Sequence, residues 1–210
     1  MAFVMASVLG VLLLRWINPP TTAVILAWEI EHGHSAQQQW RPINDISPAL
    51  QLAVIASEDQ KFPDHSGFDF DAIKKAISED RSRPRGASTI TQQVAKNVFL
   101  WQGRSYVRKG LEAWFTILME VFWPKQRILE VYLNIAEFGR GVYGAEAAAQ
   151  AFFGHPARRI NRWEAARLAA VLPSPVRMSA KRPSPFVLAR AADIRRMMWQ
   201  LGGDDYLDRL

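Results

Sequence analysis

An acidic pair, Glu58 and Asp59, ends a predicted helix and opens the stretch EDQKFPDHSG. A helix dipole places partial negative charge at the C-terminus, so a carboxylate there lies in an unfavourable field. Such placement raises the pKa of a glutamate toward neutrality, which suits a general acid or base. The alternative is an ordinary solvated helix end. Phe62 and His65 are expected to pack beside the pair and orient it.

A second polar cluster begins at Ser88 and Thr89, in the stretch GASTITQQVAKN. Hydroxyls and free backbone N–H groups at a helix N-terminus favour an anion. Residues four apart share a helix face, so the following residues predict a polar face opposite an apolar one. The side chains expected on this polar side are Gln92, Gln93, Lys96 and Asn97. The alternative is a capped amphipathic helix with one solvated side.

Cations gather in a third stretch, from Arg104 to Glu112. Arg108 and Lys109 precede Glu112 by four and three residues, so the three side chains can converge on one helix face. An ion pair within the helix accounts for this pattern. Alternatively, the two cations hold a diphosphate while Glu112 orders one of them or a metal ion.

Two further stretches are interpreted as structural. Residues 125–134 (KQRILEVYLN) place Tyr132 and Asn134 in an otherwise apolar helix. Residues 139–144 (GRGVYG) match the G-x-G-x-x-G pattern of dinucleotide-binding proteins. That fold also requires a preceding strand and alternating β/α units, and neither is predicted. The glycines therefore predict a tight turn between helices.

Helical signals dominate the elements that must position these side chains. Capping residues and apolar spacing predict helices starting near residues 47, 69–71, 88, 105 and 125, followed by shorter ones near 145–153, 163–172 and 185–201. No stretch alternates as a strand should. The expected fold is mainly α, one multi-helix domain. Residues 80–86 (DRSRPRG) predict a mobile basic loop.

Composition narrows the class of protein. The chain has 210 residues, 49% of them hydrophobic and 22% charged, as a folded domain with a large core requires. A net charge of +6 favours an anionic partner. The absence of cysteine excludes thiolate catalysis, zinc–cysteine sites and disulfides. No nucleic-acid partner is expected, because no aromatic–basic platform or recognition helix is present.

The N-terminus is apolar from residue 2 to residue 14. A membrane-spanning helix needs about 20 apolar residues, so this stretch is short. A signal peptide would need a basic region and a cleavage site, and a core helix would show a polar face. Arg15 and Trp16 suit a membrane interface. We expect a truncated transmembrane anchor at 1–17, a juxtamembrane segment at 18–45 and the catalytic domain at 46–210.

Taken in order, the four stretches resemble the family-51 glycosyltransferases, the peptidoglycan polymerases. The family pattern is E-D-x-x-F-x-x-H-x-G, then G-x-S-T-I-x-Q-Q-x-x-K-N, then R-K-x-x-E, then K-x-x-I-L-E-x-Y-L-N. This sequence matches all four, and the likeness runs from about residue 46 to 176. The resemblance implies a lysozyme-like, mainly α glycosyltransferase domain behind a membrane anchor.

The resemblance also implies a reaction and its residues. The 4-hydroxyl of lipid II attacks the anomeric carbon of the growing strand, undecaprenyl diphosphate leaves, and a β-1,4 bond forms with inversion. By position, Glu58 is the general base, and Glu112 assists diphosphate departure directly or through a divalent cation, Mg²⁺ or Mn²⁺. Residues matching phosphate-contacting or supporting positions are Lys96, Arg104, Arg108 and Lys109. Those expected to shape the cleft are Ser88, Thr89, Gln92, Gln93 and Asn97.

A single-pass inner-membrane protein follows from the resemblance, with its catalytic domain on the periplasmic side. Its expected partners are lipid II, the nascent strand, and cell-wall synthesis and division proteins. No S-x-x-K, S-D-N or K-T-G motif occurs, so transpeptidase chemistry is not expected. The alternatives are a lysozyme-like hydrolase, which needs carboxylates but not this cation cluster, and a non-catalytic membrane scaffold, which needs neither Glu58 nor the paired glutamines.

Overall fold

The fold is mainly helical, as the sequence predicts. A computed structural model describes residues 1–78, 88–103 and 105–210; the loop at 80–86 and Arg104 therefore lie outside the described residues. The α-helices of the described ranges are α1 (Ala2–Leu14), α2 (Ala23–His32), α3 (Pro48–Glu58), α4 (Phe70–Ser78), α5 (Ile90–Phe99), α6 (Tyr106–Phe122), α7 (Lys125–Ile135), α8 (Ala145–Phe153), α9 (Arg162–Val171) and α10 (Pro185–Gln200). Short 3₁₀ helices are η1 (Ile43–Asp45), η2 (Ala157–Arg159) and η3 (Gly203–Arg209).

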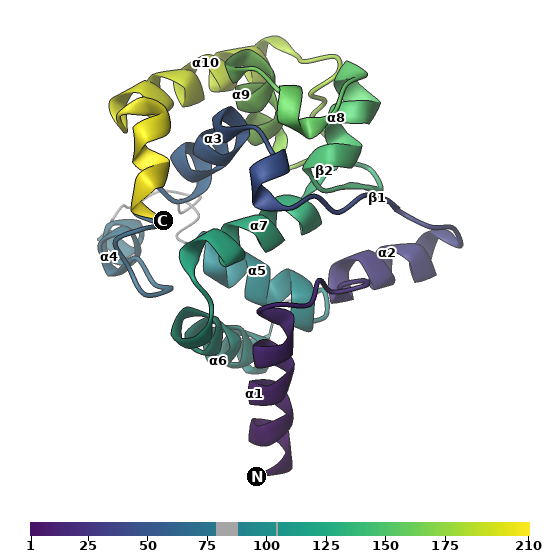
Figure 1. The fold of residues 1–210 in the computed structure, drawn as a ribbon, viewed down its shortest axis with the longest axis vertical. Coiled ribbons are helices and arrows are strands. Elements are labelled where there is room, and N and C mark those ends of the chain that lie inside the picture. The colour runs from purple at the N-terminus through teal and green to yellow at the C-terminus, as the bar shows by residue number, and fades with distance from the viewer. Residues whose placement is uncertain (79–87, 104) are drawn as a thin grey trace.

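The helices form two packed groups that meet along a shared core. In one group α5 packs between α6 and α7; in the other α3 packs against α9 and α10 (Figure 1). Helix α1 projects from one end of the molecule beside α6, and α10 lies at the opposite end (Figure 1). The functional side chains lie on α3, α5 and α6, so the contact between the two groups determines how they face one another.

Capping residues begin the helices close to the predicted positions. The Ser47 hydroxyl accepts the Ala49 N–H at 3.3 Å, with proline at the first turn of α3. A correction applies to α5, which is capped by Thr89 instead of Ser88. Thr89 is the cap because it forms a capping box with Gln92: each side chain accepts the backbone N–H of the other residue.

A small sheet replaces the predicted turn at residues 139–144. Strands β2 (Glu137–Gly139) and β3 (Val142–Tyr143) pair antiparallel, and β1 (Gln37–Gln38) pairs parallel to β3, in the order β1-β3-β2. The following Gly144 has φ of 83°, and a Cβ there would lie 2.7 Å from the Asn134 carbonyl oxygen. Only glycine fits this close return of the hairpin onto α7.

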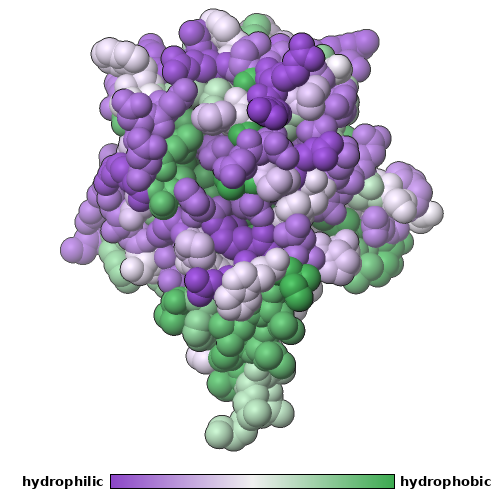
Figure 2. Space-filling view, viewed as in Figure 1, coloured by the Kyte–Doolittle hydropathy of each residue, from purple (hydrophilic) through white to green (hydrophobic). Residues whose placement is uncertain are grey.

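Helix α1 is attached to the body through the side chains of Trp123, directly after α6, and Arg127 of α7. The Trp123 indole N–H donates to the Val11 carbonyl at 2.8 Å, and the Arg127 guanidinium donates to the carbonyls of Leu14 at 2.9 Å and Ile17 at 3.1 Å. Figure 2 shows hydrophobic residues gathered on α1. Where the sequence predicts an anchor the structure has this 13-residue helix. No helix within the described ranges is long and apolar enough to cross a membrane.

Candidate functional site

Glu58 is the last residue of α3, and its half-buried side chain faces α5. One carboxylate oxygen accepts a hydrogen bond from the Gln93 side-chain amide at 2.9 Å. Burial raises the pKa of Glu58, while this hydrogen bond and the charges of Arg190 and Lys96 act to lower it. The direction agrees with the sequence prediction, but the main cause is loss of solvent and not the helix dipole.

Gln93 is held in turn by Tyr132 of α7. The Tyr132 hydroxyl donates to the Gln93 side-chain oxygen at 3.2 Å, which directs the amide nitrogen toward Glu58. Burial raises the pKa of Tyr132 well above its usual value, so the phenol remains a donor. The signal for Tyr132 in the sequence is a hydroxyl within an otherwise apolar helix. Its partner lies 39 residues earlier and was not predicted.

Asp59 locks the end of α3 to the start of α5. Its buried carboxylate accepts from His65 Nε2 at 2.8 Å and from the Ile90 backbone N–H at 2.9 Å. Because His65 Nδ1 accepts the Gly67 N–H at 3.1 Å, the imidazole proton lies on Nε2. The Thr89 hydroxyl also donates to the Gly67 carbonyl at 2.7 Å. His65 is thus an orienting residue, as expected, and the first two motifs form one rigid unit.

The two adjacent glutamines of α5 have different tasks. The Gln92 side chain is buried and closes the capping box with the Thr89 backbone N–H at 3.0 Å. Gln93 instead reaches Glu58. The structure therefore brings Gln93 to the site, whereas Gln92 holds the helix that carries it.

Glu112 lies inside α6, with 4% of its surface exposed. One of its oxygens accepts from the Arg108 guanidinium at 3.1 Å, and the other accepts from the Lys109 ammonium. Lys96 of α5 belongs to the same cluster. Burial lowers the pKa of Lys96, while the negative charge of Glu112 opposes that shift. The ion pairs predicted within the third stretch are confirmed, while the binding of a diphosphate by these cations stays a prediction.

A divalent cation fits this arrangement poorly. Across the described residues, no three His, Asp or Glu side chains converge as metal ligands. Both Glu112 oxygens already accept hydrogen bonds from cations, so a metal ion there would meet positive neighbours. The geometry assigns Glu112 to ordering Arg108 and Lys109.

Two hollows meet at Gln93. The larger, about 710 Å³, is lined by Glu58 and Ser88 together with Arg190 of α10. The smaller, about 180 Å³, is lined by Lys96, Asn97 and Tyr132. Gln93 lines both, and its hydrogen-bond partner Glu58 lines the larger. Arg190 was not predicted, because nothing in its local sequence distinguishes it from the other arginines of the C-terminal region.

The remaining residues of the fourth motif fasten the segment before α3. The Glu130 carboxylate accepts the Ile43 N–H at 2.8 Å. The Asn134 side chain is fully buried and bonds both backbone groups of Arg41, at 2.7 and 2.8 Å. The structural interpretation of this motif is confirmed for Glu130 and Asn134, whereas Tyr132 belongs to the site.

Comparison with known proteins accords with this geometry. The family model described as Transglycosylase matches residues 25–199. A protein of Xanthomonas campestris pv. campestris is 58% identical over 98% of this chain and 87% of its own length. Proteins of Pseudomonas aeruginosa (55% identical, 99% and 93% covered) and Pseudomonas fluorescens (57%, 100% and 90%) are similar too. All three are named biosynthetic peptidoglycan transglycosylase. The chain belongs to the transglycosylase family, and its activity is that of a peptidoglycan glycosyltransferase.

Proposed function

We propose that the chain polymerises glycan strands from lipid II. The acceptor 4-hydroxyl attacks the anomeric carbon of the lipid-diphosphate-linked strand, its proton passes to the protein, and undecaprenyl diphosphate leaves as a β-1,4 bond forms with inversion. The observation that carries this proposal is the place of Glu58, which lines the larger hollow and is hydrogen-bonded to Gln93, the residue shared with the smaller hollow that Lys96 lines.

Glu58 is the general base of this scheme. Among the described residues, only Gln93 hydrogen-bonds its carboxylate, and that bond engages a single oxygen. The other oxygen is thus free to accept the proton of a sugar hydroxyl. A carboxylate whose pKa is raised by burial is a stronger base than an ordinary glutamate.

Departure of a diphosphate develops negative charge, and oriented cations stabilise such charge best where water is excluded. Lys96 is half-buried and its ammonium makes no hydrogen bond to any described residue, so it is available to a phosphate oxygen. Arg108 and Lys109 lie beside it, ordered by Glu112. We assign Glu112 a positioning role. Contact of Arg104 with phosphate stays a prediction.

The saccharide contacts follow from the lining of the hollows. Ser88 lines the larger and Asn97 the smaller, which suits hydrogen bonds to sugar hydroxyls or acetamido groups. Thr89 also lines the larger hollow, and together with Gln92 it forms the capping box of α5. A hydrolase would use the same carboxylates, but a reaction with water gives no reason to gather cations around Glu112.

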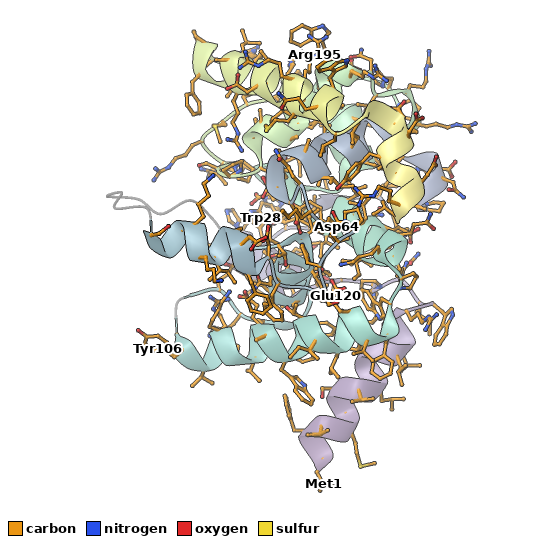
Figure 3. All side chains as sticks on the ribbon, turned by 90° about the vertical axis from the view of Figure 1, so that its left-hand side faces the viewer. Met1, Trp28, Asp64, Tyr106, Glu120 and Arg195 are labelled. Atoms are coloured by element: carbon orange, nitrogen blue, oxygen red, sulfur yellow. The ribbon has the colours of Figure 1, made fainter. Side chains whose placement is uncertain are left out.

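Membrane association is part of this proposal, because lipid II resides in the bilayer. It is supported by exposed hydrophobic side chains on α1 and the outer face of α6: Phe3, Met5, Leu9, Trp16, Val107, Ile117 and Val121. Tyr106, at the start of α6, also points away from the body (Figure 3). We place the protein at the inner membrane with its catalytic domain on the periplasmic side, residues 1–17 serving as anchor and 18–45 as juxtamembrane segment.

Incubation of the detergent-solubilised protein with labelled lipid II tests the reaction, with products sized before and after lysozyme digestion. We expect long products that lysozyme degrades, and none from Glu58→Gln. Shortening of preformed glycan would identify a hydrolase instead. Polymer of wild-type yield from Glu58→Gln would remove Glu58 from the role of base.

A further inference from the structure

A groove that shares no lining residue with the two catalytic hollows lies between α10, η3 and α3. It has a volume of about 480 Å³ and a mostly apolar lining. Leu52 and Met198 form its floor, with 1% and 3% of their surfaces exposed, and Ala192 contributes a methyl group. At its edge Trp199 is 82% exposed. An exposed tryptophan beside an apolar hollow is typical of an interaction site.

Arginines surround this groove. Arg162 pairs with Asp204 at 3.3 Å, and Arg196 pairs with Asp193 on its own helix. Arg195 differs from both: its guanidinium stacks on the Trp163 ring at 3.6 Å, and it makes no ion pair with any described residue. A stacked guanidinium keeps its charge and its N–H donors, so it is ready for a carboxylate.

The sequence segment that carries α9, α10 and η3 is basic. Residues 151–210 contain eleven Lys or Arg and five Asp or Glu, whereas residues 1–150 contain fifteen of each. The net charge of +6 therefore belongs entirely to the last 60 residues. Arg195 and Met1 lie at opposite ends of the molecule (Figure 3). Arg195 thus lies at the end opposite the apolar helix α1, so anionic lipid at the α1 end would not meet it.

We propose that this groove binds an acidic amphipathic helix of a partner protein, with aliphatic side chains on the Leu52–Met198 floor and carboxylates at Arg195 and its neighbours. Three arginines and no carboxylate line the groove among the described residues, which favours an acidic ligand, and the apolar floor requires an anchor that a phosphate ion does not have. A glycan is disfavoured because no carboxylate or amide lines the groove among the described residues. The lining residues belong to helices, so the groove offers no strand edge with which an extended peptide could pair. A helical ligand is therefore expected.

Fluorescence anisotropy of the full chain in detergent tests the proposal with three labelled helical peptides. All carry leucines at i, i+3, i+4 and i+7, and their flanking positions hold glutamate, glutamine or lysine. The glutamate peptide should bind at least about tenfold tighter than the glutamine peptide, with the lysine peptide weakest. Arg195→Ala and Trp199→Ala should each weaken it about tenfold.

Matched controls are Arg140→Ala and Trp16→Ala, which remove exposed side chains of the same types elsewhere and should leave peptide affinity unchanged. Polymerisation by Arg195→Ala and Trp199→Ala should equal that of the wild type, which shows that both fold. Equal affinity for the glutamate and glutamine peptides would overturn the proposal, as would wild-type affinity in Arg195→Ala and Trp199→Ala. Displacement of the peptide by anionic vesicles or by glycan strands would assign the groove to those ligands instead.

Discussion

The two glutamates of the site have opposite surroundings. Glu58, at the C-terminus of α3, faces a neutral amide that engages one of its oxygens. Glu112, within α6, has a cation on each oxygen. Contrasting environments are how one site assigns different tasks to two carboxylates. Glu58 is left able to take a proton, and Glu112 is committed to holding Arg108 and Lys109.

The largest effect is expected from Glu58→Gln, which keeps the shape of the side chain and removes its basicity. Loss of a general base lowers kcat by about 10²- to 10⁴-fold. KM should change little, because Gln93 retains an acceptor. Initial rates of lipid II polymerisation measure both constants. Asp193→Asn, an exposed change on α10, is the control; a mutant rate within a few-fold of this control would contradict the assignment.

Glu112→Gln should have the next largest effect, since Arg108 and Lys109 lose the charge that orders them. Misplaced catalytic groups cost about 10²-fold in rate. The acid side of the pH–rate profile should nevertheless keep its position, because Glu58 is intact. If Glu112→Gln abolished the acid limb of the pH–rate profile and Glu58→Gln kept it, Glu112 would be the base and Glu58 the positioning residue.

The pH–rate profile tests the roles of Glu58 as base and of Lys96 as cation. Activity requires Glu58 without its proton and Lys96 with it, so kcat/KM should rise through the raised pKa of Glu58 and fall through the lowered pKa of Lys96. Lys96→Arg keeps the charge at high pH and should move the alkaline limb upward, with about a three- to tenfold loss near neutrality. An unmoved alkaline limb would mean that another group titrates there.

Tyr132→Phe is a milder change, because it removes one hydrogen bond from the chain that orders Gln93. A hydrogen bond contributes about 1 kcal/mol, which corresponds to about a fivefold loss of rate. The acid limb should also move to higher pH, since the Gln93 hydrogen bond lowers the pKa of Glu58. Tyr206→Phe is the control, because that hydroxyl donates to the Gln60 carbonyl at 2.6 Å. An identical shift in the control would indicate general loosening.

The smallest effect concerns stability. Burial raises the pKa of Glu58 above its ordinary value of 4.5, so between these two values the folded state holds a proton that the unfolded state has lost. Stability therefore falls as pH rises through that window. Glu58→Gln removes the desolvation penalty of the ionised carboxylate. It should therefore raise the Tm by a few degrees at pH 8, with no gain below pH 4.5. Calorimetry at several pH values measures this; a lower Tm at pH 8 would argue against a desolvated carboxylate.

Local signals predicted most of the helices because each depends on neighbouring residues. Ser47-Pro48 starts α3, Ser105 caps α6, and Pro124 precedes α7. The sheet was missed, since strands of two or three residues are too short to show alternation. Its first strand also pairs with residues about a hundred positions later in the chain.

Within the site, the sequence by itself determined which groups share a helix. Arg108, Lys109 and Glu112 meet because residues three and four apart lie on one face, and Thr89 closes its capping box for the same reason. Such contacts depend on helical geometry alone, so spacing is enough to predict them.

Only the tertiary structure decided which groups act on Glu58. Its hydrogen bond to Gln93 spans 35 residues, and Asp59 reaches the Ile90 N–H across 31. The loss of water that raises the pKa of Glu58 is a property of the assembled cleft, as is the approach of Arg190 from α10. Burial and long-range contact depend on how the two helix groups pack together, and no local pattern of residue types encodes that packing.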